Sequence, residues 1–452
     1  MLLGKITANV KKTIYYLQRN GLKNTLDAAM ERLEDTAKNS YVYSEPSAKE
    51  LELQRSTKFP QEPLFSILVP LYRTPEVYLK ELLDSVQDQT YGKWELVLAD
   101  ATEDDSVKKI LEAYMEDDRR IRYLRLSGNG GISVNTNEGL KAVTGDYVGL
   151  LDHDDVLTPD ALFYMAKAIH DAKEQGICLK ILYSDEDKCD ADRSTYYEPH
   201  HKTDFNLDLL LSNNYICHFL VMKRELIADL GFRKEYDGAQ DYDLVLRGVS
   251  AVLPGEEQIA HIPRVLYHWR CHVGSTAQNP QSKQYAYEAG KRALEDMAAR
   301  EEYHASAEHL KHLGFYRLVY KQEIWEARQD VGVVGGRMLK HGKIAAGAYA
   351  EDGTILYQGL KNGYSGYMHR AVLAQNAAAV DVRMMKVRPE CRDLLCNLTG
   401  MPYQERQDGT FDWTILPGGT DYAALSLQFG KILRQKGYRI LWDPMWTGKL
   451  PH

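Results

Sequence analysis

Three carboxylates stand together in the segment Asp152-His153-Asp154-Asp155, which directly follows the apolar run at 147–151. Carboxylates this close repel one another unless a cation holds them, and their hard oxygen atoms favour Mg²⁺ or Mn²⁺. An ion held by one or two carboxylates keeps coordination positions for the phosphates of a substrate. An exposed acidic turn that caps a helix near Pro159 is the alternative. The apolar run before the cluster favours the metal site.

Two further clusters carry groups that could act in catalysis. Gln240-Asp241-Tyr242-Asp243 opens a predicted helix, where an aspartate is either a helix cap or a general base. In the segment 266–270 (LYHWR), His268 could bind a metal and Arg270 could neutralise a diphosphate. A single histidine is more often structural, so this segment is informative only together with the others. The segment 183–188 (YSDEDK) is a further acidic strand end.

Alternating apolar runs and helical patterns would position these groups. Short apolar runs predict strands at 65–70, 95–99, 121–126 and 147–151, and helices are expected at 77–87, 106–115 and 133–143. This alternation predicts an α/β fold with a doubly wound, mostly parallel sheet. Ligands of such sheets bind at the carboxyl ends of the strands. Asp100 and the acidic cluster both follow predicted strands and therefore fall at that edge.

A phosphatase is one interpretation of the acidic cluster. Asp152-x-Asp154-x-Val156-Leu157 after an apolar strand also fits the aspartyl nucleophile motif of haloacid dehalogenase-like phosphatases. That motif normally opens its domain, whereas here a long strand–helix pattern beginning at Phe65 precedes it. Nucleotide binding would account for this strand–helix pattern, which favours an enzyme that uses a nucleotide over a phosphatase.

The motifs taken together resemble family 2 glycosyltransferases of the GT-A fold over about residues 64–300. The resemblance is carried by residues 65–72 (FSILVPLY), 94–100 (WELVLAD), 129–137 (NGGISVNTN), 144–155 (TGDYVGLLDHDD), 238–247 (GAQDYDLVLR) and 266–270 (LYHWR). The resemblance is strongest to those members of the family that build bacterial cell-surface polysaccharides, including rhamnose-rich ones. It implies an inverting, metal-dependent enzyme that moves a sugar from a nucleotide-sugar donor to a glycan or lipid-linked acceptor. The Gln-x-x-Arg-Trp motif of processive members is absent, which implies one or a few additions.

The resemblance also implies a role for each matching residue. It places donor binding at Pro70, Tyr72, Asp100, Asn135, Asp152, Asp155 and Arg270. Asp154 and His268 would bind Mn²⁺ or Mg²⁺, and Asp241 would be the base that deprotonates the acceptor hydroxyl. At Ala101 the chain departs from the family, in which a second aspartate is frequent, so selectivity for the nucleotide base stays open. A non-catalytic sugar-binding or scaffold protein is disfavoured because the motif residues are all present.

Three segments are expected along the chain: a helical leader and linker at 1–60, the transferase domain at 61–300 and an α/β tail at 301–452. Residues 331–340 and 419–444 of the tail resemble the back half of a second GT-A domain, with Asp421 in the place of Asp241. The nucleotide-binding front half is missing from it. Such a partial repeat would shape the acceptor groove or mediate a homodimer. An unrelated α/β extension is the alternative.

The leader differs in charge from the rest of the chain. Residues 1–33 contain six Lys and Arg against two Asp and Glu, whereas all 452 residues contain 56 against 64, a net charge of −8. Apolar residues recur at helical spacing on both sides of Asn20-Gly21, which predicts two helices. A basic amphipathic pair could lie on an anionic membrane surface. A hairpin packed on the main domain is the alternative.

Composition excludes several other classes of protein. A net acidic chain is a poor general nucleic-acid binder, because that binding depends on a positive field. No apolar run approaches the ~18 residues of a membrane span, and the N-terminus lacks a signal-peptide pattern. The six cysteines contain no CxxC pair, which predicts reduced thiols. We therefore expect a cytoplasmic protein, with the inner face of the cytoplasmic membrane as the site suggested by the leader.

Overall fold

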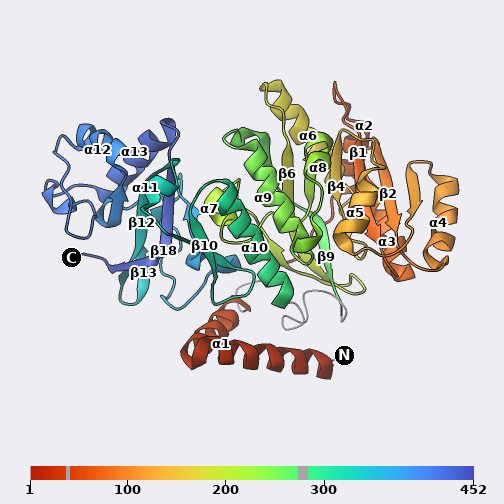
Figure 1. The fold of residues 1–452 in the computed structure, drawn as a ribbon, viewed down its shortest axis with the longest axis horizontal. Coiled ribbons are helices and arrows are strands. Elements are labelled where there is room, and N and C mark those ends of the chain that lie inside the picture. The colour runs from red at the N-terminus through yellow and green to blue at the C-terminus, as the bar shows by residue number, and fades with distance from the viewer. Residues whose placement is uncertain (1, 37–40, 273–283, 452) are drawn as a thin grey trace. The chain divides into compact units, whose positions relative to one another are not determined.

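The computed structural model describes residues 2–36, 41–272 and 284–451, without the side chains of residues 2–12 and 35–36 (Figure 1). The chain forms two compact units. The first unit comprises Ser40–Phe205 and Asn214–Met297, and the second comprises Met1–Asn39, Asn206–Asn213 and Ala298–His452. These limits differ from the expected segments, because the leader and a short internal stretch group with the tail.

The first unit is built on a mixed sheet, for which nine strands are recorded within the described part of the chain. Their order is β3-β2-β1-β4-β8-β6-β9-β5, with β7 paired to β6. The strands are β1 (Phe65–Leu71), β2 (Trp94–Asp100), β3 (Ile121–Arg125), β4 (Tyr147–Leu150), β5 (Val156–Leu157), β6 (Ile181–Asp190), β7 (Tyr196–His200), β8 (Leu220–Lys223) and β9 (Ile259–Cys271). The run from β3 to β4 is parallel, as is the pair β6–β9. The prediction of an α/β fold with a mostly parallel sheet is confirmed.

Helices cover this sheet because their apolar residues recur along one face. In α3, Leu79, Leu82, Leu83 and Val86 are buried at helical spacing against the core of the sheet. Burying each such side chain contributes about 1.5–3 kcal/mol. The helices of this region are α2 (Ala48–Ser56), α3 (Glu76–Gln87), α4 (Ser106–Asp117), α5 (Ile132–Leu140), α6 (Ala161–Glu174), α8 (Arg224–Leu230), α9 (Gln240–Val252) and α10 (Gln284–Arg300).

The carboxyl edge of the parallel strands brings the predicted site segments together. Leu71 at the end of β1 is in register with Asp100 at the end of β2, and β4 runs parallel on the other side of β1. After the acidic segment, the short strand β5 pairs antiparallel with β9, with Val156 opposite His268. The acidic segment is therefore held between β4 and β9.

The second unit repeats part of this order of elements. Strand β12 pairs in parallel with β18 and antiparallel with β13 and β17. In the first unit, β6 likewise pairs in parallel with β9 and antiparallel with β7 and β8. Helix α13 precedes β18, as α9 precedes β9 (Figure 1). The main elements are α7 (Leu207–Leu210), β10 (Ala305–His309), β11 (Tyr316–Tyr320), α11 (Ile324–Ala327), β12 (Val331–Lys340), β13 (Lys343–Ala346), β14 (Ala348–Tyr349), β15 (Gln375–Asn376), β16 (Ala379–Val380), β17 (Met385–Val387), α12 (Arg392–Thr399), α13 (Tyr422–Gln435) and β18 (Arg439–Lys449). This correspondence supports the partial repeat, which stays a prediction.

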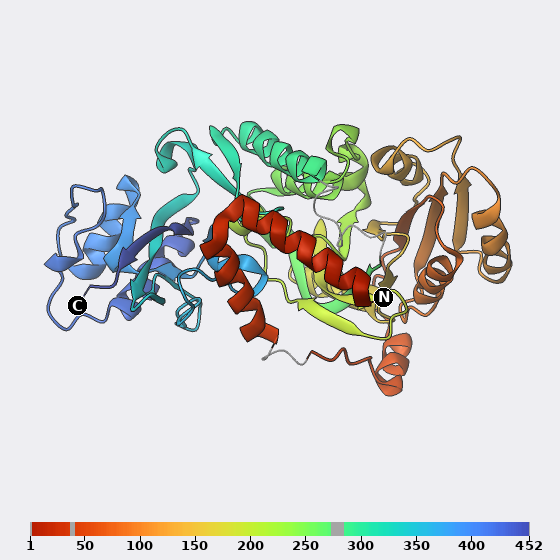
Figure 2. The same ribbon diagram turned by 90° about the horizontal axis from the view of Figure 1, so that it is seen from below.

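The leader forms α1 (Leu2–Thr36), which bends sharply at Gly21 (Figure 2). Gly21 has φ 76° and ψ 169°, a conformation that glycine adopts without a Cβ penalty. In the expected linker, Ser47 and Glu50 form a capping box that starts α2. Within the described residues, no helix combines the length and the apolar character needed to cross a membrane.

Candidate active site

The acidic segment lies in the loop between β4 and β5. The side chain of Asp152 is 57% exposed and that of Asp154 is 20% exposed. Asp154 Oδ2 lies 2.9 Å from Nε2 of His272, just beyond the end of β9. Carboxylate oxygen and imidazole nitrogen together suit a divalent transition metal such as Mn²⁺. These two residues fit the ion that the sequence leads us to expect.

Asp155 anchors this segment to β9. Its Oδ1 accepts a hydrogen bond of 2.7 Å from the backbone N–H of Arg270, and its Oδ2 accepts one of 2.5 Å from the Tyr267 hydroxyl. Burial raises the pKa of Asp155 well above its ordinary value, and the charges of Asp154 and Asp152 raise it further. Both carboxylate oxygens of Asp155 accept hydrogen bonds from the protein. The geometry therefore favours an anchoring role for Asp155 over the expected contact with the nucleotide sugar.

Arg270 and His268 face the interior of the first unit. The buried Arg270 guanidinium donates to the backbone oxygen of Asp154 at 2.6 Å and pairs with Glu81 at 2.5 Å. Nδ1 of His268 lies 2.5 Å from Asp187 Oδ1, and its ring packs against Tyr43 and Tyr196. The structure does not bring His268 to Asp154. Four strand residues span about 13 Å, and His272, four residues further along the chain, is the histidine that contacts Asp154.

The expected base lies in the first turn of α9. Asp241 is half-buried, and its Oδ2 accepts a hydrogen bond of 2.9 Å from Asn214 Nδ2. The helix N-terminus favours a carboxylate there through its partial positive charge. Asp243 is buried and forms ion pairs with Arg233 and Arg247. Of the two aspartates, Asp243 is therefore placed to stabilise the fold, and the role of Asp241 as a base stays a prediction.

The segment 214–218 connects this aspartate to the acidic loop. Two of its residues contact Asp241: Asn214 through its side-chain amide, and Cys217 through its thiol, which lies 3.6 Å from Asp241 Oδ2. Nε2 of His218 lies 3.8 Å from Asp152 Oδ2, and its ring stacks on Tyr267 with centroids 4.6 Å apart. Asp152, Asp155 and His218 also form a group able to hold a metal within the described chain. Sequence reasoning missed His218 and His272, because neither lies in a recognised motif.

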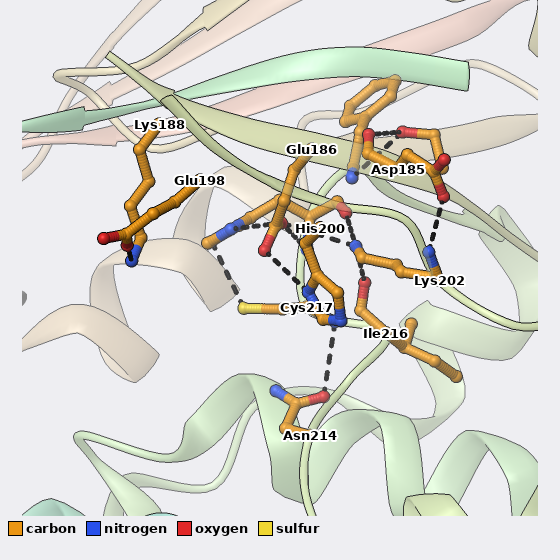
Figure 3. Close-up of polar contacts among 12 residues, drawn as sticks. Asp185, Glu186, Lys188, Glu198, His200, Lys202, Asn214, Ile216 and Cys217 are labelled. Atoms are coloured by element: carbon orange, nitrogen blue, oxygen red, sulfur yellow. Dashed lines mark hydrogen bonds and ion pairs between the residues drawn. The ribbon is translucent and has the colours of Figure 1, made fainter. Parts of the chain in front are cut away.

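Buried polar groups hold this segment in place (Figure 3). Glu186 Oε2 lies 3.1 Å from His218 Nδ1, and the buried Lys202 ammonium donates to the carbonyl of Ile216 at 2.7 Å and to that of His218. Burial alone would raise the pKa of Glu186, but Lys202, His200 and His218 lower it well below its ordinary value. Burial alone would lower the pKa of His218, but Cys217 and Glu186 raise it well above its ordinary value. Glu186 therefore orients His218 through its contact with Nδ1.

The predicted nucleotide residues lie at the ends of β1 and β2. Asp100 is buried and accepts hydrogen bonds of 2.9 Å from the Tyr123 hydroxyl and from the Thr102 N–H. Pro70 is half-buried, and the Tyr72 hydroxyl donates to Glu103 at 2.9 Å. These three residues share one edge, as expected. Their contact with a nucleotide stays a prediction.

Asn135 is buried near the start of α5. Its amide donates to Asn129 at 2.9 Å and accepts from the Gly130 N–H at 3.0 Å. Asn135 therefore shapes the loop before the helix, and a role in lining the donor pocket would be exerted through that loop.

A mostly parallel sheet with an acidic loop after its fourth strand is the arrangement of GT-A glycosyltransferases, and the fold of the first unit is of this class. Residues 66–231 match the family model described as Glycosyl transferase family 2. Residues 66–231 are thus similar to family 2 glycosyltransferases.

The chain is also similar to two curated bacterial proteins and to one solved structure. Protein y4gI of Sinorhizobium fredii, described as uncharacterized, is 42% identical over 240 residues, which cover 53% of this chain and 26% of that protein. The O-antigen biosynthesis protein RfbC of Myxococcus xanthus is 38% identical over 259 residues, which cover 57% and 20%. A solved structure of S. aureus TarS with UDP-GlcNAc matches with 20% identity and a TM-score of 0.42, covering 52% of this chain and 66% of that one. The chain matches only about a quarter or less of the length of the first two relatives.

Proposed function

We propose that this protein is an inverting, metal-dependent, non-processive glycosyltransferase. It transfers a sugar from a nucleotide-sugar donor to a glycan or lipid-linked acceptor in the synthesis of a cell-surface polysaccharide. The observation that carries this proposal is the segment 214–218, which places Asp241 near the acidic loop through the contacts of Asn214 and His218. The O-antigen protein among the relatives supports the polysaccharide context.

Asp241 acts as the general base in this proposal. It takes the proton of the acceptor hydroxyl, whose oxygen attacks the anomeric carbon of the donor sugar. The nucleoside diphosphate leaves from the opposite face, so the configuration inverts. General base catalysis is typically worth ~10²–10⁴-fold in rate.

Asp154 and His272 are the residues we propose as ligands of Mn²⁺ or Mg²⁺. Their 2.9 Å contact and their partial exposure support this pair over Asp154 with His268. The ion, when bound, would supply positive charge that stabilises the departing diphosphate. His218 is held by Glu186, and its Nε2 points toward Asp152 in the acidic loop. From there it would donate a hydrogen bond to an oxygen of the nucleotide sugar.

Nucleotide release from a panel of nucleotide sugars with Mn²⁺ tests this function. A thermal-shift screen first selects the donor, because a ligand that binds the folded state raises its stability. We expect release of a nucleoside diphosphate that depends on one donor. Release of inorganic phosphate from p-nitrophenyl phosphate, without nucleotide release, would favour the phosphatase. Binding without turnover of any donor would favour a sugar-binding protein.

We further propose that the protein works at the inner face of the cytoplasmic membrane, with residues 1–33 in contact with it. A lipid-linked acceptor would make this location useful. The tail at 301–452 would shape the acceptor groove or mediate a homodimer, and it would not bind a donor by itself. The partial repeat supports this role, because the second unit has counterparts only of elements from β6 onward.

A further inference from the structure

The second arm of α1 presents an apolar face to solvent. Leu22, Leu26, Met30 and Leu33 recur at helical spacing and are 65%, 53%, 45% and 72% exposed. An amphipathic helix of a globular protein normally turns such a stripe toward the core. Isolated exposed apolar residues are ordinary, whereas four on one stripe mark an interaction surface.

The opposite, polar face is the one that docks on the second unit. Glu31 is buried and accepts hydrogen bonds from the N–H groups of Ser365 and Gly366, at 2.9 and 2.6 Å. Glu34 accepts hydrogen bonds from Lys361 and from Tyr364, at 2.8 and 2.9 Å. These contacts set the rotation of the helix about its axis. The apolar stripe therefore faces outward because the polar face is held.

Charge distinguishes this outward face from the docked one. Lys23 and Arg32 are both exposed and flank the stripe, since helical spacing places them on either side of Leu22 and Leu26. The acidic residues Glu31 and Glu34 are engaged by the second unit. The first arm adds Ile14, which is 50% exposed. The exposed surface is thus apolar along its centre, with Lys23 and Arg32 at its margins.

We propose that this outward face of α1 inserts into the headgroup region of an anionic phospholipid surface. Apolar side chains enter the interface of a bilayer while flanking lysines and arginines bind anionic headgroups. A second copy of the chain is a poorer occupant, because a two-fold contact would bring the same basic margins together. The inference deepens the membrane contact proposed above and rests on that contact, not on the transfer chemistry.

Vesicle sedimentation of the full chain tests the proposal. Wild-type protein should bind vesicles of phosphatidylcholine with phosphatidylglycerol, and added salt should weaken that binding. The Leu26→Gln/Leu33→Gln variant should bind at least about tenfold more weakly, because apolar insertion drives the contact. The Lys23→Glu/Arg32→Glu variant should lose the preference for phosphatidylglycerol. Leu53→Gln is the matched control, since Leu53 is 67% exposed on α2, outside the stripe.

Two outcomes would overturn the inference. One is wild-type protein that does not sediment with anionic vesicles at low salt. The other is light scattering that shows a dimer lost in Leu26→Gln/Leu33→Gln, with equal vesicle binding by the variant and the wild type. Nucleotide release from a soluble donor needs no vesicles, so its failure would count against the transferase alone. These variants remove exposed side chains, and their melting temperature checks that folding is intact.

Discussion

Asp241 and Asp243 lie on the same first turn of α9 but have different partners. Asp241→Asn should lower nucleotide release from the selected donor by ~10²–10⁴-fold, because the amide cannot accept the acceptor's proton. The affinity for the nucleoside diphosphate, measured by calorimetry, should stay within about twofold of the wild type, since the shape of the side chain is kept. Wild-type turnover in this variant would remove Asp241 from the role of base.

Asp243→Asn is its matched control. It weakens buried ion pairs with Arg233 and Arg247 and should lower the melting temperature first. A loss of turnover without a loss of stability would contradict this assignment.

The two histidines of the β9 region give a second test at the residue scale. His272→Gln should raise the Mn²⁺ concentration needed for half-maximal nucleotide release, because it removes a nitrogen ligand beside Asp154. His268→Gln should leave that concentration unchanged and reduce thermal stability instead, since His268 contacts Asp187 in the interior. The reverse pattern in the Mn²⁺ titrations would restore His268 as the metal ligand.

At the scale of elements, the segment 214–218 depends on Glu186 for its geometry. Glu186→Gln removes the charge that faces His218 Nδ1 while keeping a hydrogen-bonding side chain. We expect kcat for nucleotide release to fall while the affinity for the free nucleoside diphosphate is kept, because Glu186 positions His218 and does not contact the nucleotide. Equal losses in both quantities would indicate a general loss of structure.

Lys188→Gln serves as the comparison for this variant. Lys188 lies on the same strand and pairs with Glu198 at 2.6 Å, and it makes none of the contacts described for the segment 214–218. It should retain wild-type kcat and nucleotide affinity. A similar fall in kcat for both variants would show that any change of charge on β6 disturbs turnover.

Among the described residues, a buried ion pair between Asp208 and Arg328 joins distant parts of the chain. Asp208 in α7 contacts Arg328 at 2.7 Å, and Asn376 donates to the same carboxylate at 2.6 Å. Burial alone would raise the pKa of Asp208, but Arg328 lowers it below its ordinary value. The lowered pKa means that this stabilisation is present above the unfolded pKa of about 3.9 and is lost as the pH falls through the folded pKa.

Asp208→Asn tests this coupling. The variant leaves a buried arginine short of one partner and should lower the free energy of unfolding at pH 7 by about 3–5 kcal/mol. The difference from the wild type should shrink as the pH falls below the unfolded pKa of about 3.9 and should vanish once the pH passes the lower folded pKa. Urea unfolding at both pH values measures it. A difference that stays constant down to pH 2 would show that Asp208 does not stabilise the fold through its charge.

Local pattern was enough to determine the framework of the first unit. Apolar runs that end in Asp100 and Asp152, with helical spacing between them, predicted strands, helices and the functional edge, because both periodicities are short-range properties. The pairing of β5 with β9 and the contact of His272 with Asp154 were decided by tertiary structure. The burial of α7 among tail residues was likewise invisible, because it joins positions far apart in sequence.

The helical leader shows most clearly what the sequence determined and what the tertiary structure decided. Its sequence determined two amphipathic helical arms with a break at Gly21 and a net positive charge over residues 1–33, since composition and spacing alone specify them. Which face would be buried could not be read from the sequence, because amphipathicity normally predicts that the apolar face packs inward. The carboxylates of Glu31 and Glu34, bound by groups of residues 361–366, turned the leucines outward. Local chemistry thus specified the helix, and contacts between distant residues decided its orientation.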